Sequence, residues 1–235
     1  MYYVFDVDGT LTPSRGRIDE KFCQFLLNCA KKDRLVLVTG SDSAKTIEQI
    51  GDELFRAVDY SFNCSGNVVY HRGNLIFTSD WELPEAPWQW LENQLYKSEY
   101  PWKFGRHFEQ RPGLLNFSFV GRNATGNNRT EYYEWDRRTN QRAQLCNQFN
   151  RKFPDLEAQI GGETGVDIFP KGKDKAQILD WLTGPVCFFG DRLDPEGNDR
   201  PLADRIQKDK RGASYAVRNW RDTWQLLKLM NLVQE

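Results

Sequence analysis

The sequence has almost no net charge and no long hydrophobic run. Its 32 basic residues balance 33 acidic ones, and the net charge of -1 argues against nucleic acid and against an anionic membrane surface as partners. The longest apolar runs, at residues 35–38 and 185–189, are far shorter than the roughly 20 residues that cross a bilayer. We therefore expect no transmembrane segment, no signal peptide and no membrane partner.

The sequence also lacks closely spaced cysteines. Its five cysteines, at positions 23, 29, 64, 146 and 187, are scattered, and none belongs to a CxxC pair. This spacing argues against a zinc site and against a disulfide framework. Such cysteines are typical of small core residues in a reducing compartment, so we predict a cytoplasmic protein.

The hydrophobic pattern predicts an α/β core with a parallel sheet, interrupted by an insert of a different class. Strands and helices alternate before and after the insert, which is typical of a parallel sheet. Inside the insert, helices back strands that are paired by a hairpin, which is typical of an α+β unit. The predicted elements are strand 2–5, helix 19–31, strand 35–38, helix 42–55, hairpin 68–78, helix 88–97, strand 115–120, helix 130–152, hairpin 156–169, helix 175–181, strand 186–189, strand 214–217 and a closing helix from 220. We predict a Rossmann-like core of residues 1–79 and 173–235, and an insert of residues 80–172 with an antiparallel sheet.

The segment DVDGTLT at residues 6–12 carries the strongest chemical signal. It follows an apolar run typical of a buried strand, so Asp6 and Asp8 stand at a strand's carboxyl end, where open α/β sheets bind ligands. A turn at Gly9 can bring both carboxylates to one phosphate and one metal ion. We predict Asp6 as the nucleophile that forms an aspartyl phosphate and Asp8 as the general acid/base. By itself, Asp-Gly would instead be typical of a surface turn.

Two further segments can contribute to phosphoryl transfer. TGSD at residues 39–42 ends a strand and opens a helix, where the Ser41 hydroxyl and backbone N–H groups suit a phosphate. The same segment could equally serve only to cap that helix. Lys175 stands at a predicted helix start and could balance the charge of an aspartyl phosphate, although a lone lysine is usually solvated.

A second buried strand also runs directly into a carboxylate. FFGD at residues 188–191 ends at Asp191, and Asp199 follows eight residues later. Carboxylate and carbonyl oxygens suit Mg²⁺, so Asp6, the backbone carbonyl of Asp8 and Asp191 are predicted ligands. Asp199 would be a further ligand or would orient one. A plain acidic loop is the alternative, and the repeated pattern of a strand followed by Asp favours the metal site.

These four segments, in this order, resemble the motifs of the haloacid dehalogenase (HAD) superfamily. The insert is similar to the cap domain of the eukaryotic-type phosphomannomutases. The matching segments of the insert are HFEQRPGLLNFSFVGR at 107–122, IGG at 160–162 and DIFP at 167–170. In the core, DK at 174–175, FFGD at 188–191 and GND at 197–199 also resemble that family. The resemblance covers nearly the whole chain and implies a HAD core with an inserted α/β cap.

The resemblance implies a phosphomutase that interconverts mannose 6-phosphate and mannose 1-phosphate. Mg²⁺ is then the cofactor, and glucose 1,6-bisphosphate or mannose 1,6-bisphosphate is the activator that phosphorylates Asp6. While one phosphate of the bisphosphate reacts, the other must be held, and arginine suits that task. Family positions assign substrate contacts to Arg15 in the core, to Arg111, Arg122 and Arg129 in the cap, and to Asp167 at the sugar hydroxyls. Taken singly, each arginine would be typical of a solvated surface.

Three details leave alternatives open. Strand alternation places Arg122 on the polar face only if the strand at 115–120 extends so far. Gly165 stands where the family usually has serine, Lys173 where it tends to have an aromatic residue, and residues 200–211 depart from the family pattern.

The family also implies a homodimer through the caps, and the aromatic segment 81–102 could either contribute to it or pack internally. A sugar-phosphate phosphatase of the same superfamily is the main functional alternative, and a catalytically silent sugar-phosphate sensor is another.

Overall fold

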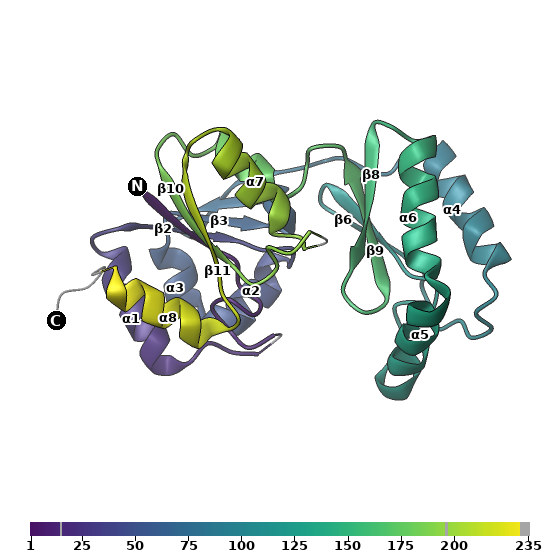
Figure 1. The fold of residues 1–235 in the computed structure, drawn as a ribbon, viewed down its shortest axis with the longest axis horizontal. Helices are drawn as coiled ribbons and strands as arrows, with labels where there is room; N and C mark the ends of the chain where they lie inside the picture. The colour runs from purple at the N-terminus through teal and green to yellow at the C-terminus, as the bar shows by residue number, and fades with distance from the viewer. Residues whose placement is uncertain (15, 196, 231–235) are drawn as a thin grey trace. The chain divides into compact units, whose positions relative to one another are not determined.

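The chain forms two compact units in the computed structural model, which describes residues 1–14, 16–195 and 197–230. The core unit comprises Met1–Thr78 and Gly172–Glu235, and the cap unit comprises Ser79–Lys171 (Figure 1). These bounds differ by one residue from the predicted insert of residues 80–172. Among the described residues, each helix is too short or too polar to span a bilayer.

The core unit is built on a seven-stranded sheet of order β11-β10-β1-β2-β3-β4-β5. The five strands from β11 to β3 are parallel, which confirms the predicted parallel sheet, and the hairpin β4–β5 adds two antiparallel strands at one edge. The elements of the core unit are β1 (Tyr2–Phe5), α1 (Glu20–Ala30), β2 (Arg34–Val38), α2 (Ser43–Ile50), α3 (Asp52–Ala57), β3 (Tyr60–Asn63), the 3-10 turn η1 (Cys64–Gly66), β4 (Val68–His71), β5 (Asn74–Thr78), the 3-10 helix η2 (Lys175–Asp180), β10 (Val186–Gly190), α7 (Arg200–Lys208), β11 (Gly212–Ala216) and α8 (Trp220–Leu229).

Alternating residues of the core strands serve two hydrophobic clusters. Phe5 and Phe189 belong to a cluster with α1, α3 and α8, whereas their neighbours Val4 and Phe188 belong to a cluster with η2 and α7. The strands are therefore apolar on both faces, as expected of a parallel sheet covered on both sides. This burial holds the carboxyl ends of β1 and β10 side by side, since Phe5 pairs with Phe189.

Several predicted elements are wrong in detail. The helix predicted at 42–55 is divided into α2 and α3 at Gly51, whose φ of 84° ends an α-helix. Residues 175–180 form a 3-10 helix rather than an α-helix. The short strand β3 and the helix α7, which begins with Pro201 in its first turn, were not predicted.

The cap unit is a four-stranded antiparallel sheet of order β6-β7-β9-β8. Figure 1 shows its helices on one side of this sheet. Its elements are α4 (Glu85–Lys97), β6 (Phe108–Arg111), β7 (Leu114–Phe117), α5 (Gly126–Thr139), α6 (Gln141–Lys152), β8 (Leu156–Gly161) and β9 (Gly165–Pro170). The helix predicted at 130–152 is two helices, because Asn140 adopts a left-handed conformation between them. The strand predicted at 115–120 ends at Phe117, and β6 was not predicted.

The two faces of the cap sheet differ in chemistry. Leu115, Phe117, Val166 and Ile168 lie in a buried cluster that also contains residues of α4, α5 and α6. The intervening positions include Asn116 and Asp167, which pair directly across β7 and β9. Strand alternation therefore gives the cap sheet a polar face opposite its helices.

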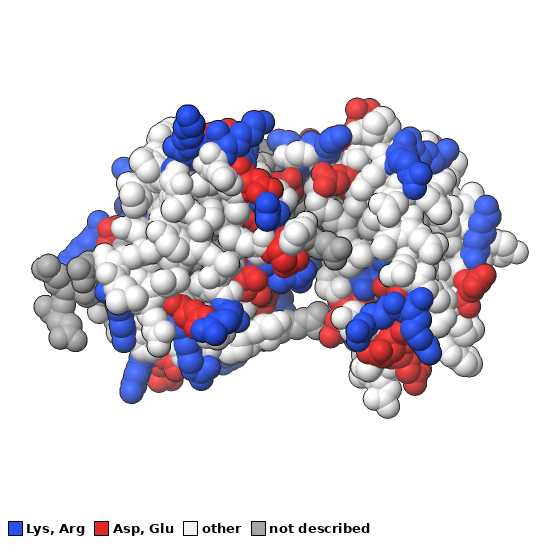
Figure 2. Space-filling model, in the orientation of Figure 1, with Lys and Arg blue, Asp and Glu red and all other residues white. Residues whose placement is uncertain are grey.

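Charge is mixed on the face of the molecule that Figure 2 draws. Figure 2 shows basic and acidic side chains interspersed on the face that is drawn, without a large area of one sign among the coloured residues.

Candidate active site

Asp6 lies directly after β1 and is nearly buried, with 4% of its surface exposed. Its backbone N–H donates to the Phe189 carbonyl, which fixes it beside the end of β10. The loop that follows turns at Gly9, where φ is 81°. A Cβ atom at Gly9 would lie 2.4 Å from Asp191 Oδ2, so only glycine lets this loop approach Asp191.

Lys175 bridges two carboxylates in this buried site. Its Nζ lies 2.6 Å from Asp6 Oδ1 and 2.7 Å from Asp199 Oδ1, and 2% of the lysine is exposed. Burial by itself lowers the pKa of Lys175, but Asp199 and Asp6 outweigh it and raise the pKa above 10.5. Lys175 is therefore a buried, charged lysine and not a solvated one.

Three carboxylates gather around this lysine. Ligand atoms of Asp6, Asp191 and Asp199 all lie within 4.8 Å of one another. Burial raises the pKa of Asp6 above 3.8, against the lowering effect of Lys175, and burial followed by the charge of Asp199 raises the pKa of Asp191. Carboxylates crowded into a buried site are better stabilised by a cation, and hard oxygen ligands fit Mg²⁺.

Asp199 has a second task in this arrangement. Its Oδ1 accepts from Lys175, and its Oδ2 accepts from the backbone N–H of Arg192. Asp199 is fully buried at the start of α7. The carboxylate therefore joins the acidic group and fixes Lys175 beside Asp6.

The Asp8 carboxylate is bound by a buried glutamine. Its Oδ1 accepts a hydrogen bond of 2.9 Å from Gln49 Nε2. The same amide also reaches Thr12 Oγ1 and the Gly16 carbonyl, at 3.3 and 3.4 Å. Gln49, at 3% exposure, thus ties Asp8 to the loop that carries it.

Ser41 lies in the loop between β2 and α2. Because β2 pairs in parallel with β1, this loop leaves the sheet at the same edge as Asp6. The Ser41 N–H donates to Thr39 Oγ1 and is thus not open to a phosphate in this conformation. The helix-capping alternative holds for Asp42, whose side chain accepts from the Lys45 N–H at the start of α2.

Predicted substrate residues of the cap meet around a glutamate. Glu109 Oε2 accepts from Arg111 Nη2 at 3.0 Å and from Arg122 Nε at 2.6 Å. Asp167 accepts a 2.6 Å hydrogen bond from Asn116 Nδ2. Burial raises the pKa of Asp167, while Asn116 and the charges of Arg111 and Arg122 oppose the rise, which places both arginines within electrostatic range of Asp167.

The strand does not extend to Arg122, so the condition for the strand-alternation argument is not met, although the residue does reach the polar cluster. Since β7 ends at Phe117, Arg122 enters from a loop, and its backbone N–H donates to the Arg106 carbonyl. Arg129 pairs with a different carboxylate, Glu163, at 3.3 Å. Arg15 lies outside the described residues.

Gly165 has a spatial reason to lack a side chain. A Cβ atom there would lie 2.7 Å from Asn116 Nδ2 and 2.9 Å from the Gly161 carbonyl oxygen. In this chain the position where the family usually has serine is filled by the Asn116 amide, which turns toward Asp167.

Gln49, Glu109 and Asn116 are site residues that the sequence interpretation missed. Glu109 and Arg111 stand two apart in β6, so a recognised strand there would have placed them on one face. Asn116 lies an even number of residues before Arg122, so strand alternation would place both on one face of the predicted strand. No sequence pattern near Gln49 indicated its contact with Asp8, because the two residues are 41 positions apart in the chain.

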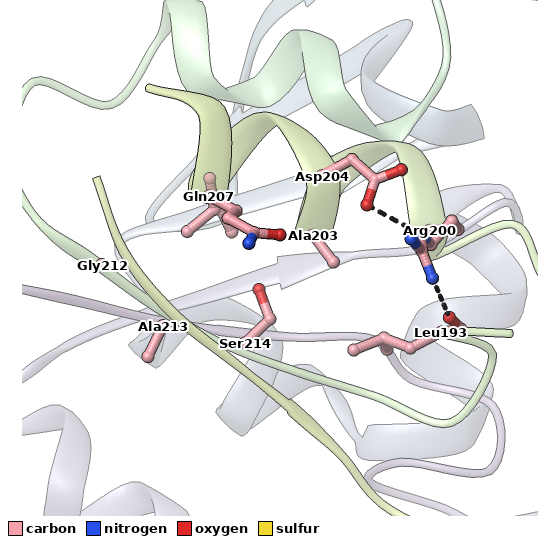
Figure 3. A pocket seen from close by; sticks show the side chains of 9 residues that line it. Leu193, Arg200, Ala203, Asp204, Gln207, Gly212, Ala213 and Ser214 are labelled. Carbon is pink, nitrogen blue, oxygen red and sulfur yellow. Dashed lines mark hydrogen bonds and ion pairs between the residues drawn. The ribbon is translucent and has the colours of Figure 1, made fainter. Parts of the chain in front are cut away.

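A pocket of about 340 Å³ lies elsewhere in the core unit, between α7 and β11 (Figure 3). In it, Arg200 bonds to Asp204 and to the Leu193 carbonyl. None of the described residues that line it is a predicted site residue. The buried carboxylate site, and not this pocket, gathers the chemistry.

Solved structures share the fold of this chain. A haloacid dehalogenase-like hydrolase from Bacteroides thetaiotaomicron superposes with a TM-score of 0.62 at 13% identity, covering 97% of this chain and 98% of that one. The C-terminal domain of trehalose-6-phosphate phosphatase from C. albicans gives a TM-score of 0.61 at 15% identity, covering 98% and 90%. These likenesses establish the fold.

Sequence comparison establishes the family. The model of the family described as eukaryotic phosphomannomutase matches residues 22–233. Phosphomannomutase from Saccharomyces cerevisiae is 33% identical over 243 residues, covering 97% of this chain and 94% of the yeast protein. Phosphomannomutase 1 from Homo sapiens is 35% identical over 236 residues, covering 94% and 88%. The chain therefore belongs to the eukaryotic phosphomannomutase family.

Proposed function

We propose that this protein interconverts mannose 6-phosphate and mannose 1-phosphate through a phosphorylated Asp6 and a hexose 1,6-bisphosphate. The observation that carries the proposal is the group formed by buried Asp6, Lys175 and Asp199 with half-buried Asp191 in a chain of this family. A nucleophilic carboxylate between a fixed ammonium and further carboxylates suits phosphoryl transfer, which depends mainly on positioning and charge.

The reaction requires two transfers at Asp6. In the first, the C1 hydroxyl of mannose 6-phosphate attacks the phosphoryl group on Asp6, Asp8 takes the hydroxyl proton, and the bond between phosphorus and the Asp6 oxygen breaks. The bisphosphate then binds in the reverse orientation. In the second transfer, Asp6 attacks the phosphorus at C6, and Asp8 returns the proton to the leaving sugar oxygen.

The remaining residues hold the reacting groups. Lys175 balances the charge of Asp6 and of the phosphoryl group, and Gln49 holds Asp8 through its amide. We assign to Ser41 a contact with the transferring phosphoryl group. Mg²⁺ would be held by Asp6, Asp191, Asp199 and the backbone carbonyl of Asp8. When bound, it would neutralise charge on the phosphoryl oxygens.

The cap residues would bind the part of the substrate that does not react. Arg111, Arg122 and Arg129 supply guanidinium groups for the second phosphate, and Asp167 accepts from sugar hydroxyls. Arg15 would contribute from the core. The activator would be glucose 1,6-bisphosphate or mannose 1,6-bisphosphate, which phosphorylates Asp6 before the first turnover.

Two properties of the whole protein belong to the same proposal. Four of the cysteines are buried and all five are free, which suits a cytoplasmic protein. Tyr96 and Trp102 of the aromatic segment 81–102 are 90% and 60% exposed, which suits a homodimer contact on the cap. Sedimentation equilibrium of the wild type and of Trp102→Ala tests the dimer.

Phosphorus NMR of mannose 1-phosphate with the protein, Mg²⁺ and a trace of glucose 1,6-bisphosphate tests the activity. Mannose 6-phosphate that forms only with the bisphosphate is the expected product. Inorganic phosphate as the main product would make the protein a phosphatase, and an unchanged spectrum would refute both activities on this sugar.

Two variants separate the roles of the core and the cap. We expect Asp6→Asn to lower mutase and phosphatase rates by about 10⁴-fold or more, because the nucleophile is lost. We expect Arg122→Ala to lower the mutase rate by about 100-fold while hydrolysis of a small phosphoester changes little. Equal losses in both assays for Arg122→Ala would remove the argument for a second phosphate in the cap.

A further inference from the structure

The arginines proposed to bind phosphate are already paired with carboxylates. One oxygen of Glu109 accepts from both Arg111 and Arg122, at 3.0 and 2.6 Å. Arg129 pairs with Glu163 at 3.3 Å. A phosphate that enters this cluster therefore meets guanidinium groups that already have an anionic partner.

Glu109 is fixed in this position by the fold. It lies on β6 two residues before Arg111, and its cross-strand partner is Asn116, which pairs in turn with Asp167. The side chains of Glu109, Arg111 and Arg122 are 28%, 26% and 26% exposed, so the three charges are partly shielded from water. Burial by itself would raise the pKa of Glu109, but the two arginines outweigh it and lower the pKa below 4.5. Glu109 is thus ionised at neutral pH.

The charges show why a carboxylate is needed here. Two guanidinium groups that share one acceptor oxygen repel each other, and Glu109, the carboxylate in direct contact with both, compensates half of their charge, while Asp167 acts on them without a direct ion pair. A sugar phosphate carries about two negative charges at neutral pH and could compensate both arginines. Glu109 therefore resembles a permanent, weaker substitute for the substrate phosphate.

We propose that Glu109 is a resident anion that holds Arg111 and Arg122 together before the substrate binds and lowers their affinity for the substrate phosphate. The inference rests on the proposed mutase function. Each phosphate of the bisphosphate must bind the cap arginines in one half-reaction and leave them before the next. A cluster without a competing carboxylate would retain the phosphate and slow this exchange.

Glu163 provides a matched control. It also pairs with a cap arginine, but its side chain is 59% exposed and its distance from Arg129 is longer. Solvent screens such a pair, so its removal changes phosphate affinity little. The contrast between the two glutamates separates local competition from a general change in charge.

The test is calorimetric titration of metal-free protein with inorganic phosphate, for the wild type, Glu109→Gln and Glu163→Gln. We expect Glu109→Gln to bind phosphate about tenfold more tightly, about 1.4 kcal/mol, and Glu163→Gln to change the Kd less than twofold. Arg122→Ala should abolish the binding heat, which assigns the measured site to the cap. Glu109→Asp, which keeps the charge, should retain the weak affinity of the wild type.

Turnover gives the second readout. In the bisphosphate-activated assay, Glu109→Gln should lower both KM and kcat, because the phosphate leaves the cap more slowly. Unchanged or weaker phosphate binding by a folded Glu109→Gln variant would overturn the inference, even if the wild type is an active mutase. A wild type without mutase activity would instead refute the proposed function, whatever the phosphate titration shows.

Discussion

Replacing Lys175 by methionine tests whether the buried site depends on one ammonium group. The lysine is 2% exposed and serves two carboxylates that are themselves nearly inaccessible, with Asp6 and Asp199 side chains 6% and 0% exposed. Methionine has a similar length and lacks the charge. The variant therefore leaves two adjacent buried carboxylates without their shared cation.

Lys175→Met should lower the free energy of unfolding by a large amount. Removing one partner of a buried ion pair typically destabilises a protein by about 3–5 kcal/mol. For a protein of this size, each kcal/mol lowers the thermal midpoint by about 2–4 °C, so the core should unfold about 6–20 °C earlier. Since total stabilities are about 5–15 kcal/mol, the variant should remain folded at low temperature.

The pH dependence identifies the cause. In the folded wild type, burial raises the pKa of Asp6 above 3.8 even with Lys175 present, and without the ammonium the pKa should rise further. A carboxyl whose folded pKa is raised binds protons on folding, so its contribution to stability falls as pH rises through the interval above 3.8. Because the pKa of Asp6 is about 8 in the folded wild type, the deficit of Lys175→Met should grow as pH rises from about 7 to about 10, where Asp6 ionises in the wild type and stays protonated in the variant.

Urea denaturation of metal-free protein across this pH range is the assay. Adding Asp199→Asn to the methionine variant should recover part of the loss at pH 7, because only one unpaired carboxylate then remains. A Lys175→Met variant within 1 kcal/mol of the wild type at pH 7 would refute the charge argument. So would a deficit that does not change with pH.

Two further predictions concern the cap. Gly165→Ser should lower the free energy of unfolding by about 1–3 kcal/mol and raise KM. Its Cβ would lie within 3.0 Å of Asn116 Nδ2 and of the Gly161 carbonyl oxygen, and would push Asn116 away from Asp167. Thermal melting and steady-state kinetics check this, and an unchanged melting temperature and KM would contradict it. Arg142→Met should lower the free energy of unfolding by about 3–5 kcal/mol. Arg142 is buried, pairs with Asp136 at 2.8 Å and donates to the Gly162 and Gly165 carbonyls. Adding Asp136→Leu should recover most of that loss in urea denaturation, and a single variant as stable as the wild type would show that the pair contributes little.

The sequence by itself determined the class of the core and the location of its chemistry. Strands that are apolar on both faces, followed directly by Asp6 and by Asp191, are local signals, and parallel strands bring their carboxyl ends to one edge. The hairpins at 68–78 and 156–169 were also local, because turn residues separate short apolar runs. These features depend on residues close together in the chain.

Backbone conformation at single residues could not be predicted in the same way. Gly51 and Asn140 interrupt helices whose hydrophobic spacing continues across the break. Whether such a residue adopts positive φ depends on the packing of both neighbouring segments. The short strands β3 and β6 likewise exist because the strands beside them offer hydrogen bonds.

Only the tertiary structure decided which charged groups meet. Lys175 joins Asp6 across 169 residues of sequence, and Asn116 joins Asp167 across 51. The pairing of Arg111 and Arg122 through Glu109 depends on the bounds of β6 and on a loop that returns Arg122 to it. Sequence motifs identify the residues that can form a site, but strand register and burial decide which of them come into contact.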